Sequence, residues 1–169
     1  LGLMLVDQGK LELDRPVSHY WPEFAGGGKD DVLVQHLFDH RAGVSYVDAA
    51  LKPGDLYDWE TMVSAIEKTS PNFPPGSREM YLNMTHGYLL GELFARVNGG
   101  RRIARFLRED LSGPLGLDWH FALDDSLMTR VAKVYQTTPT ALMDMVRDNP
   151  DTIFAKSMKG FRSDEDFNS

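Results

Sequence analysis

Apolar residues recur at the spacing of an amphipathic helix in five parts of the chain. The clearest case is Trp59, Met62, Val63 and Ile66, at i, i+3, i+4 and i+7, directly after Asp58, which can cap a helix N-terminus. The pattern predicts five helices. The first three run from Asp31 to a stop at Gly43, over Trp59–Ile66, and over Leu90–Val97 before Gly99-Gly100. The fourth runs from Ile103 to Leu111 before Gly113-Pro114, and the fifth follows the cap Thr138 and Pro139 and contains Leu142, Met145 and Val146.

The two ends of the chain do not look like natural ends of a domain. Leu1–Val6 is apolar from its first residue and leads into a polar stretch in which Gly9 suits a helix C-terminus. We interpret residues 1–8 as the last turns of a buried helix that begins before Leu1. Residues 163–169 are polar and contain no closing element. The sequence therefore predicts an internal piece of a longer protein.

Strand signals are nearly absent. No run of Val, Ile, Thr and aromatic residues alternates with polar residues over four or more positions. The fold class is therefore predicted to be mostly α.

Composition narrows the class of protein. The chain has 169 residues, of which 42% are hydrophobic and 25% charged, so a packed core is expected. Its net charge of −7 and thinly spread basic residues argue against nucleic acid as a partner. No apolar run is long enough to suggest a membrane segment. The lack of cysteine and of a signal peptide favours the cytoplasm, although the residues that decide the compartment precede Leu1.

Metal and phosphate sites have weak signals. His36 and His40 lie four residues apart in a predicted helix, which would put both on one face as a zinc pair requires. No HExxH motif or nearby third ligand accompanies them, so a structural role is the preferred interpretation. Gly26–Lys29 lacks the spacing of a phosphate-binding loop. We expect no metal and no cofactor.

The chain has no complete set of catalytic residues. Neither the GxSxG nucleophile pattern nor an SxxK pair occurs, and Lys68-Thr69 lacks the glycine of a KTG motif. One short element remains, in which Pro75-Gly76 precedes Tyr81-x-Asn83. A phenol and an amide one residue apart can both project into a cleft when the backbone is extended. Taken alone, the pair fits a packed tyrosine and a helix-start asparagine better than a catalytic pair.

The order of several segments resembles the serine β-lactamase and penicillin-binding protein family, and most of all its class C β-lactamase-like carboxylesterases. The resemblance covers residues 1 to about 123. It rests on the blocks at residues 5–17, 20–24, 36–44, 75–76, 81–83, 87–92 and 113–117.

This resemblance implies a two-part fold, an α/β part and an all-α part, with the active site between them. Residues 1–10 would end the helix that bears the nucleophile, residues 30–150 would form the helical part, and residues 151–169 would lead back to the α/β part. The whole would be a single piece, residues 1–169, of one β-lactamase-related domain.

The resemblance also implies a serine hydrolase that works through an acyl-enzyme, with an ester favoured over a β-lactam or peptide-like substrate. Tyr81 would be the acid/base partner, and Asn83 would orient the substrate or position the lysine. The Ser and Lys of SxxK are expected shortly before Leu1, so this piece alone should be inactive. Leu33 replaces the family's helix-starting threonine, which leaves Asp30 or Asp31 as the expected cap.

Two alternatives stay open at this point. The chain could be a non-catalytic helical binding module derived from the same fold, or a helical protein that binds metal through His36 and His40. The sequence does not indicate an oligomeric state.

Overall fold

The computed structural model describes residues 1–52, 54–133 and 141–158. The chain divides into two compact units, Leu1–Phe121 and Ala122–Ser169. The first unit contains α1 (Gly2–Asp7), α2 (Val34–Phe38), α3 (Trp59–Lys68), α4 (His86–Val97) and α5 (Ile103–Leu107), and the second contains α6 (Ala141–Asp148) and α7 (Ile153–Ser157).

Shorter helical turns fill parts of the connections. The described 3₁₀ segments are η1 (Val17–His19), η2 (Pro22–Ala25), η3 (Asp55–Tyr57) and η5 (Asp125–Arg130), and one π-helical segment, η4 (Arg108–Ser112), continues α5. Within the described ranges there is no strand, only an isolated antiparallel bridge between Pro16 and Leu33. The mostly α prediction is confirmed for this part of the chain.

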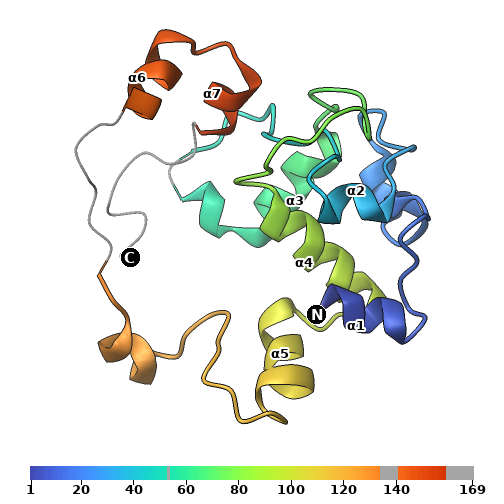
Figure 1. The fold of residues 1–169 in the computed structure, drawn as a ribbon, viewed down its shortest axis with the longest axis vertical. Helices are drawn as coiled ribbons and strands as arrows, with labels where there is room; N and C mark the ends of the chain where they lie inside the picture. Colours follow the sequence, from blue (N-terminus) through green and yellow to red (C-terminus); the bar gives the residue numbers. More distant parts are fainter. Residues whose placement is uncertain (53, 134–140, 159–169) are drawn as a thin grey trace. The chain divides into compact units, whose positions relative to one another are not determined.

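Helix α4 organises the core of the first unit. It contacts α1, α2, α3 and α5, and Figure 1 shows it crossing the unit with α2 and α3 on one side and α1 and α5 on the other. Its buried residues Leu89, Leu93 and Phe94 join a single apolar cluster with residues of the other elements. Gly2 allows α1 to approach Phe38 of α2 closely, because a Cβ at position 2 would lie 2.5 Å from the Phe38 ring.

The two best-defined helix predictions are confirmed. Asp58 caps α3 as expected, its Oδ1 accepting the Thr61 N–H at 2.9 Å. Helix α4 covers the predicted Leu90–Val97 and starts one turn earlier, at His86. The predicted cap Thr138 and Pro139 lie outside the described residues.

The prediction for α2 is wrong at both ends. The helix starts at Val34 with Leu33 as its N-cap, and neither Asp30 nor Asp31 caps it. The Leu33 N–H instead donates to Nδ1 of His36 at 3.2 Å, so a histidine satisfies the N-terminus from within the helix. The helix also stops at Phe38, well before Gly43, because the backbone turns left-handed at His40, with φ of 61°.

Apolar side chains at alternate positions lie exposed near the end of the first unit. Leu115, Leu117, Trp119 and Phe121 each expose at least two fifths of their surface. Their alternation resembles a strand pattern, but these residues form no strand. Within the described residues, no helix is long and apolar enough to cross a bilayer.

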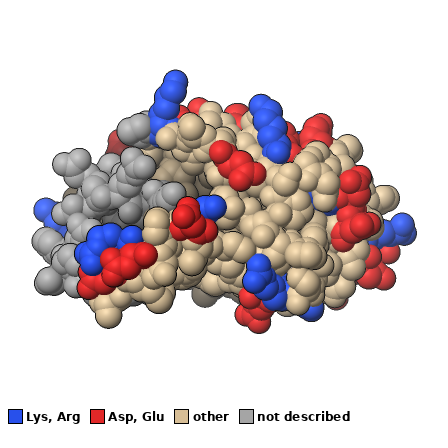
Figure 2. Space-filling view, turned by 90° about the horizontal axis from the view of Figure 1, so that it is seen from above, with Lys and Arg blue, Asp and Glu red and all other residues tan. Residues whose placement is uncertain are grey.

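Charged side chains are mixed on the face shown in Figure 2, where lysines and arginines lie among acidic residues. Ion pairs also connect elements of the first unit, such as Arg102 with Glu60 and Glu92. The absence of a nucleic-acid partner stays a prediction.

Candidate active site

The Pro75-Gly76 turn is fixed to the loop that follows α2. The Gly76 N–H donates to the Arg41 carbonyl at 2.9 Å, and the Arg41 guanidinium donates to the Gly76 carbonyl. Gly76 has a φ of 75° and lies under the His36 ring, which a Cβ would meet at 3.0 Å. A glycine is required there for both reasons. The turn therefore starts the Tyr81 segment from a defined position.

Tyr81 lies on the surface of a firmly held segment. Tyr81 is 69% exposed, whereas the next residue, Leu82, is fully buried. The Met80 N–H donates to the carbonyl of His40 at 3.0 Å, and the Leu82 N–H donates to Nδ1 of the same histidine at 3.2 Å. The residues on both sides of Tyr81 are thus anchored while its phenol faces outward.

Asn83 follows in the turn that leads into α4. It is half-buried, and its N–H donates to the Tyr81 carbonyl at 3.0 Å. The hydroxyl of Thr85, one residue before α4, donates to the Val44 carbonyl. These bonds connect the start of α4 to the loop after α2, so the turn that carries Asn83 is fixed at both ends.

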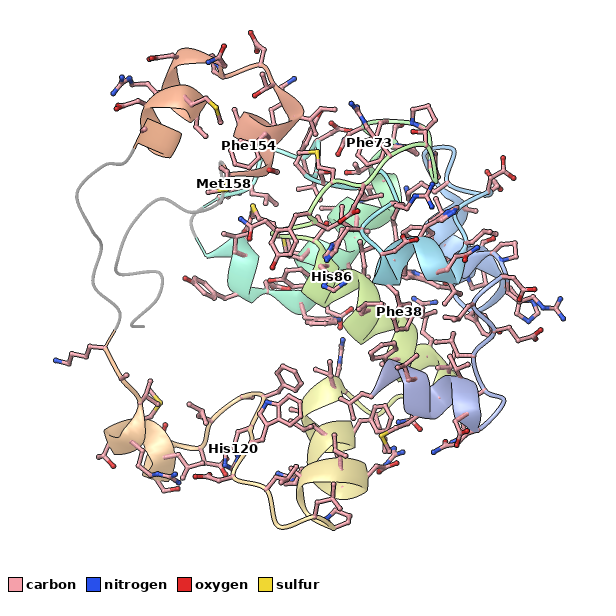
Figure 3. The ribbon with its side chains drawn as sticks, in the orientation of Figure 1. Phe38, Phe73, His86, His120, Phe154 and Met158 are labelled. Atoms are coloured by element: carbon pink, nitrogen blue, oxygen red, sulfur yellow. The ribbon has the colours of Figure 1, made fainter. Side chains whose placement is uncertain are left out.

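The His40 ring contacts both Tyr81 and a second histidine, His86. The His40 ring lies 4.8 Å from the Tyr81 ring and 4.3 Å from the His86 ring, measured between centroids. His86 begins α4 (Figure 3). Burial lowers the pKa of His86, the charge of a protonated His40 would lower it further, and a hydrogen bond to the Leu37 backbone opposes both. Its Nε2 is buried and has no hydrogen-bond partner.

The proposed pairing of His36 and His40 on one helix face is wrong. Because α2 ends at Phe38, His40 lies beyond the helix, and its ring turns toward Tyr81 and His86. His36 instead bonds the backbone of Leu33. Burial lowers the pKa of His36, with Asp39 opposing this effect and Arg41 adding to it. In the described part of the chain, no three His, Asp or Glu residues are grouped so as to hold a metal ion.

Sequence reasoning proposed Tyr81 and Asn83 but did not single out His40, which contacts Tyr81, or His86, which contacts His40. Residues 40, 81 and 86 meet only through the turn after α2 and the start of α4, and no spacing rule connects them.

A profile of the Beta-lactamase family matches residues 1–160 of the chain. The chain belongs to the Beta-lactamase family. The resemblance predicted from the ordered sequence blocks is therefore confirmed. The predicted fold class is confirmed as well, because solved structures of this fold superpose on the chain.

Relatives within the Beta-lactamase family carry several names. The esterase/beta-lactamase LipL of Mycobacterium tuberculosis is 32% identical over 114 residues, which is 68% of this chain and 26% of LipL. A penicillin-binding protein homologue from Caulobacter crescentus superposes with a TM-score of 0.75 at 42% identity, over 80% of this chain and 36% of that protein. A family VIII carboxylesterase superposes with a TM-score of 0.73 at 33% identity, over 78% and 36% respectively.

The chain thus spans about a quarter to a third of the length of these Beta-lactamase family relatives. Members with esterase and β-lactamase names are both similar to it, so family membership alone does not select a substrate. The roles of Tyr81 and Asn83 remain predictions.

Proposed function

We propose that this chain is the helical part of a serine hydrolase that cleaves small carboxylic esters through an acyl-enzyme. In this proposal Tyr81 is the catalytic acid/base, and Asn83 orients the substrate or the catalytic lysine. The nucleophilic serine and its lysine come from a part of the protein outside these residues, because the chain contains no SxxK. Membership of the Beta-lactamase family supports this assignment.

The observation that carries the proposal is the exposure of Tyr81. Tyr81 is 69% exposed although the residues on both sides are hydrogen-bonded to His40. A tyrosine kept for packing would turn inward, as Leu82 does. A fixed backbone with an outward phenol suits a group that must meet a reacting atom supplied by another part of the protein.

The chemistry assigned to Tyr81 is proton transfer. The serine Oγ attacks the ester carbonyl carbon, and its proton passes to the tyrosine–lysine pair and then to the departing alcohol. Water then attacks the acyl carbon, releases the acid and restores the serine. A phenol ordinarily has a pKa near ~10, so Tyr81 can accept a proton at neutral pH only beside a cation such as the catalytic lysine.

An ester is preferred as substrate because esterase names occur twice among the relatives described above, once together with β-lactamase. The residues that line the acyl pocket in this proposal lie mostly outside the chain. Rates of hydrolysis of an ester and of a β-lactam therefore have to be compared to identify the substrate class.

The test uses the protein encoded by the complete reading frame around this sequence. We expect hydrolysis of p-nitrophenyl butyrate, and a fall in kcat of about 100-fold or more in Tyr81→Phe, because positioned acid–base groups contribute factors of that size. Tyr57→Phe is the matched control, since Tyr57 is also an exposed tyrosine, at 61%, and has no proposed role. Its kcat should stay within twofold of wild type.

Three outcomes would contradict parts of the proposal. A Tyr81→Phe variant with the wild-type rate would remove Tyr81 from the mechanism. Faster turnover of nitrocefin than of the ester would make a lactam the substrate. A complete protein that hydrolyses neither would favour the non-catalytic module.

A further inference from the structure

His40 adopts a backbone conformation that is unusual for its residue type. It follows α2 at the position where glycine is most common, with φ of 61°, and the Arg41 N–H reaches back to the His36 carbonyl at 2.8 Å. A residue with a Cβ is strained in this left-handed conformation by about 1 kcal/mol. The contacts of the histidine side chain offset part of this strain.

His40 makes three contacts with the Tyr81 region, two through its imidazole and one through its backbone carbonyl. Its Nδ1 accepts the Leu82 N–H at 3.2 Å, its ring lies 4.8 Å from the Tyr81 ring, and the His40 carbonyl accepts the Met80 N–H at 3.0 Å. One residue thus holds the backbone on both sides of Tyr81 and contacts its ring. Forty-two positions of sequence separate the two ends of the Nδ1 contact.

We propose that neutral His40 is a positioning residue for Tyr81 and releases the Tyr81 segment when it is protonated. The inference rests on the proposed function only for its effect on catalysis. Because Nδ1 accepts a hydrogen bond, the neutral ring carries its proton on Nε2. Adding a proton to Nδ1 would bring it against the Leu82 N–H, and both groups would then be donors.

Titratable or charged groups face His40 from α4, from the Tyr81 segment and from its own segment. The His86 ring from α4 lies 4.3 Å away, and charging both rings would place two cations together. The Tyr81 phenol faces it from the other segment. On its own segment, Asp39 and Arg41 flank it, and their charges pair with each other at 3.9 Å. We expect protonation of His40 Nδ1 to loosen the Tyr81 segment, because the bond from the Leu82 N–H is then lost.

The experiment compares His40→Gly and His40→Asn in the complete protein. Glycine and asparagine both tolerate the left-handed backbone, so both variants should fold. Asparagine keeps an acceptor one bond from Cγ, in the place of Nδ1, but loses the ring and does not titrate. Glycine loses the acceptor as well. We expect kcat to fall at least about tenfold in His40→Gly with little change in KM, and to fall less in His40→Asn.

Two readouts separate positioning from a merely structural role. The kcat of the wild type should be lower in mild acid than at neutral pH, and His40→Asn should lack that component. By NMR, the Leu82 amide should exchange at least about tenfold faster in His40→Gly, and in the wild type at low pH, but not in His40→Asn at low pH. His19→Asn is the control, because His19 also contacts a tyrosine, Tyr20, at 4.7 Å.

The outcomes distinguish this inference from the proposed function. If Tyr81→Phe is slow but His40→Gly keeps the wild-type kcat and pH profile, the positioning role is wrong and the function stands. If Tyr81→Phe is fully active, the proposed function is wrong, and Leu82 exchange alone judges whether His40 holds the segment. Unchanged Leu82 exchange in His40→Gly overturns the inference in either case.

Discussion

Lys29 is fully buried at the end of the Gly26–Gly28 turn, and its ammonium donates to three backbone carbonyls, those of Gly26, Glu67 and Thr69. The carbonyls of Glu67 and Thr69 lie at the C-terminal end of α3. No N–H group further along the helix is available to donate to carbonyls at this end. The lysine that a sequence reader could mistake for a phosphate-binding group is therefore a cap for α3.

Replacing Lys29 should destabilise the protein. In Lys29→Met the side chain keeps its length, but three carbonyls lose their donor, and we expect the free energy of unfolding to fall by about 2 kcal/mol at neutral pH. Urea unfolding followed by circular dichroism measures this loss. The control is Lys68, an exposed lysine at the end of α3. Lys68→Met should change the free energy of unfolding by less than about 0.5 kcal/mol.

Lys29 should also make stability depend on alkaline pH. Burial lowers the pKa of Lys29 to about 8, while the nearby carboxylates of Glu67, Asp30 and Asp48 oppose this shift. The folded protein thus binds this proton more weakly than the unfolded chain, so the Lys29 contribution to the unfolding free energy rises with pH from about 8 to 10.5, by at most about 3 kcal/mol. If Lys29→Met shows the same rise as wild type, the lysine is not its source.

At the scale of elements, the packing of α3 against α4 depends on Gly91. A Cβ at this position would lie 2.6 Å from the Trp59 ring, whose Nε1 also donates to Glu92 at 2.8 Å. The two helices approach closely at this point because α4 offers no side chain there. The contact joins two helices that were each predicted from their own apolar spacing.

Gly91→Ala should therefore be destabilising although alanine favours helices. We expect a loss of about 1–3 kcal/mol from overpacking against Trp59, minus a gain of up to about 1 kcal/mol in helix propensity. Gly87→Ala in the same helix isolates the propensity effect, since nothing lies within 4 Å of its Cβ position. Equal changes in the melting temperatures of the two variants would show that the Trp59 contact does not matter.

The elements differ in how well the sequence predicted them. Helices α3 and α4 have several apolar residues at helical spacing, and both were found. Helix α2 was predicted too long. Glycine is the residue expected just after a helix, so the prediction extended α2 to Gly43, whereas His40 takes that position in the structure. The π-helical turn after α5 was not predicted either, because the spacing of Ile103–Leu111 fits both helical forms.

The candidate site was predictable only in part for a related reason. Tyr81 and Asn83 stand in a short motif within an ordered series of blocks, which a reader of the sequence can recognise. The contact of His40 with Tyr81 and His86 depends on where α2 stops and how α4 begins. Sequence spacing carries no information about that meeting.

At the scale of the whole molecule, two half-buried histidines should make the protein sensitive to acid. Burial lowers the pKa of both His36 and His86 below the ordinary value of 6.5. The unfolded chain then takes up protons before the folded one does. The stability that these groups contribute is complete above pH 6.5 and is lost as the pH falls from there through their lowered pKa values.

The double variant His36→Gln, His86→Gln should lose part of this acid sensitivity, although it is less stable than wild type at neutral pH. The measurement is the urea midpoint at pH 7.5 and at pH 5 for each protein. His120→Gln is the control, because His120 lies on the surface beside Asp118. An identical fall in midpoint for the double variant and wild type would assign acid sensitivity to other groups.

The exposed row formed by Leu115, Leu117, Trp119 and Phe121 affects how this chain can be handled. Exposed apolar side chains at alternate positions form a surface to which a second molecule can bind, and aromatic residues strengthen such association. Purified by itself, the polypeptide should aggregate as its concentration rises. It should also increase the fluorescence of dyes that bind hydrophobic surfaces. Fusion to a highly soluble carrier, or exchange of Trp119 and Phe121 for serine, is the practical remedy.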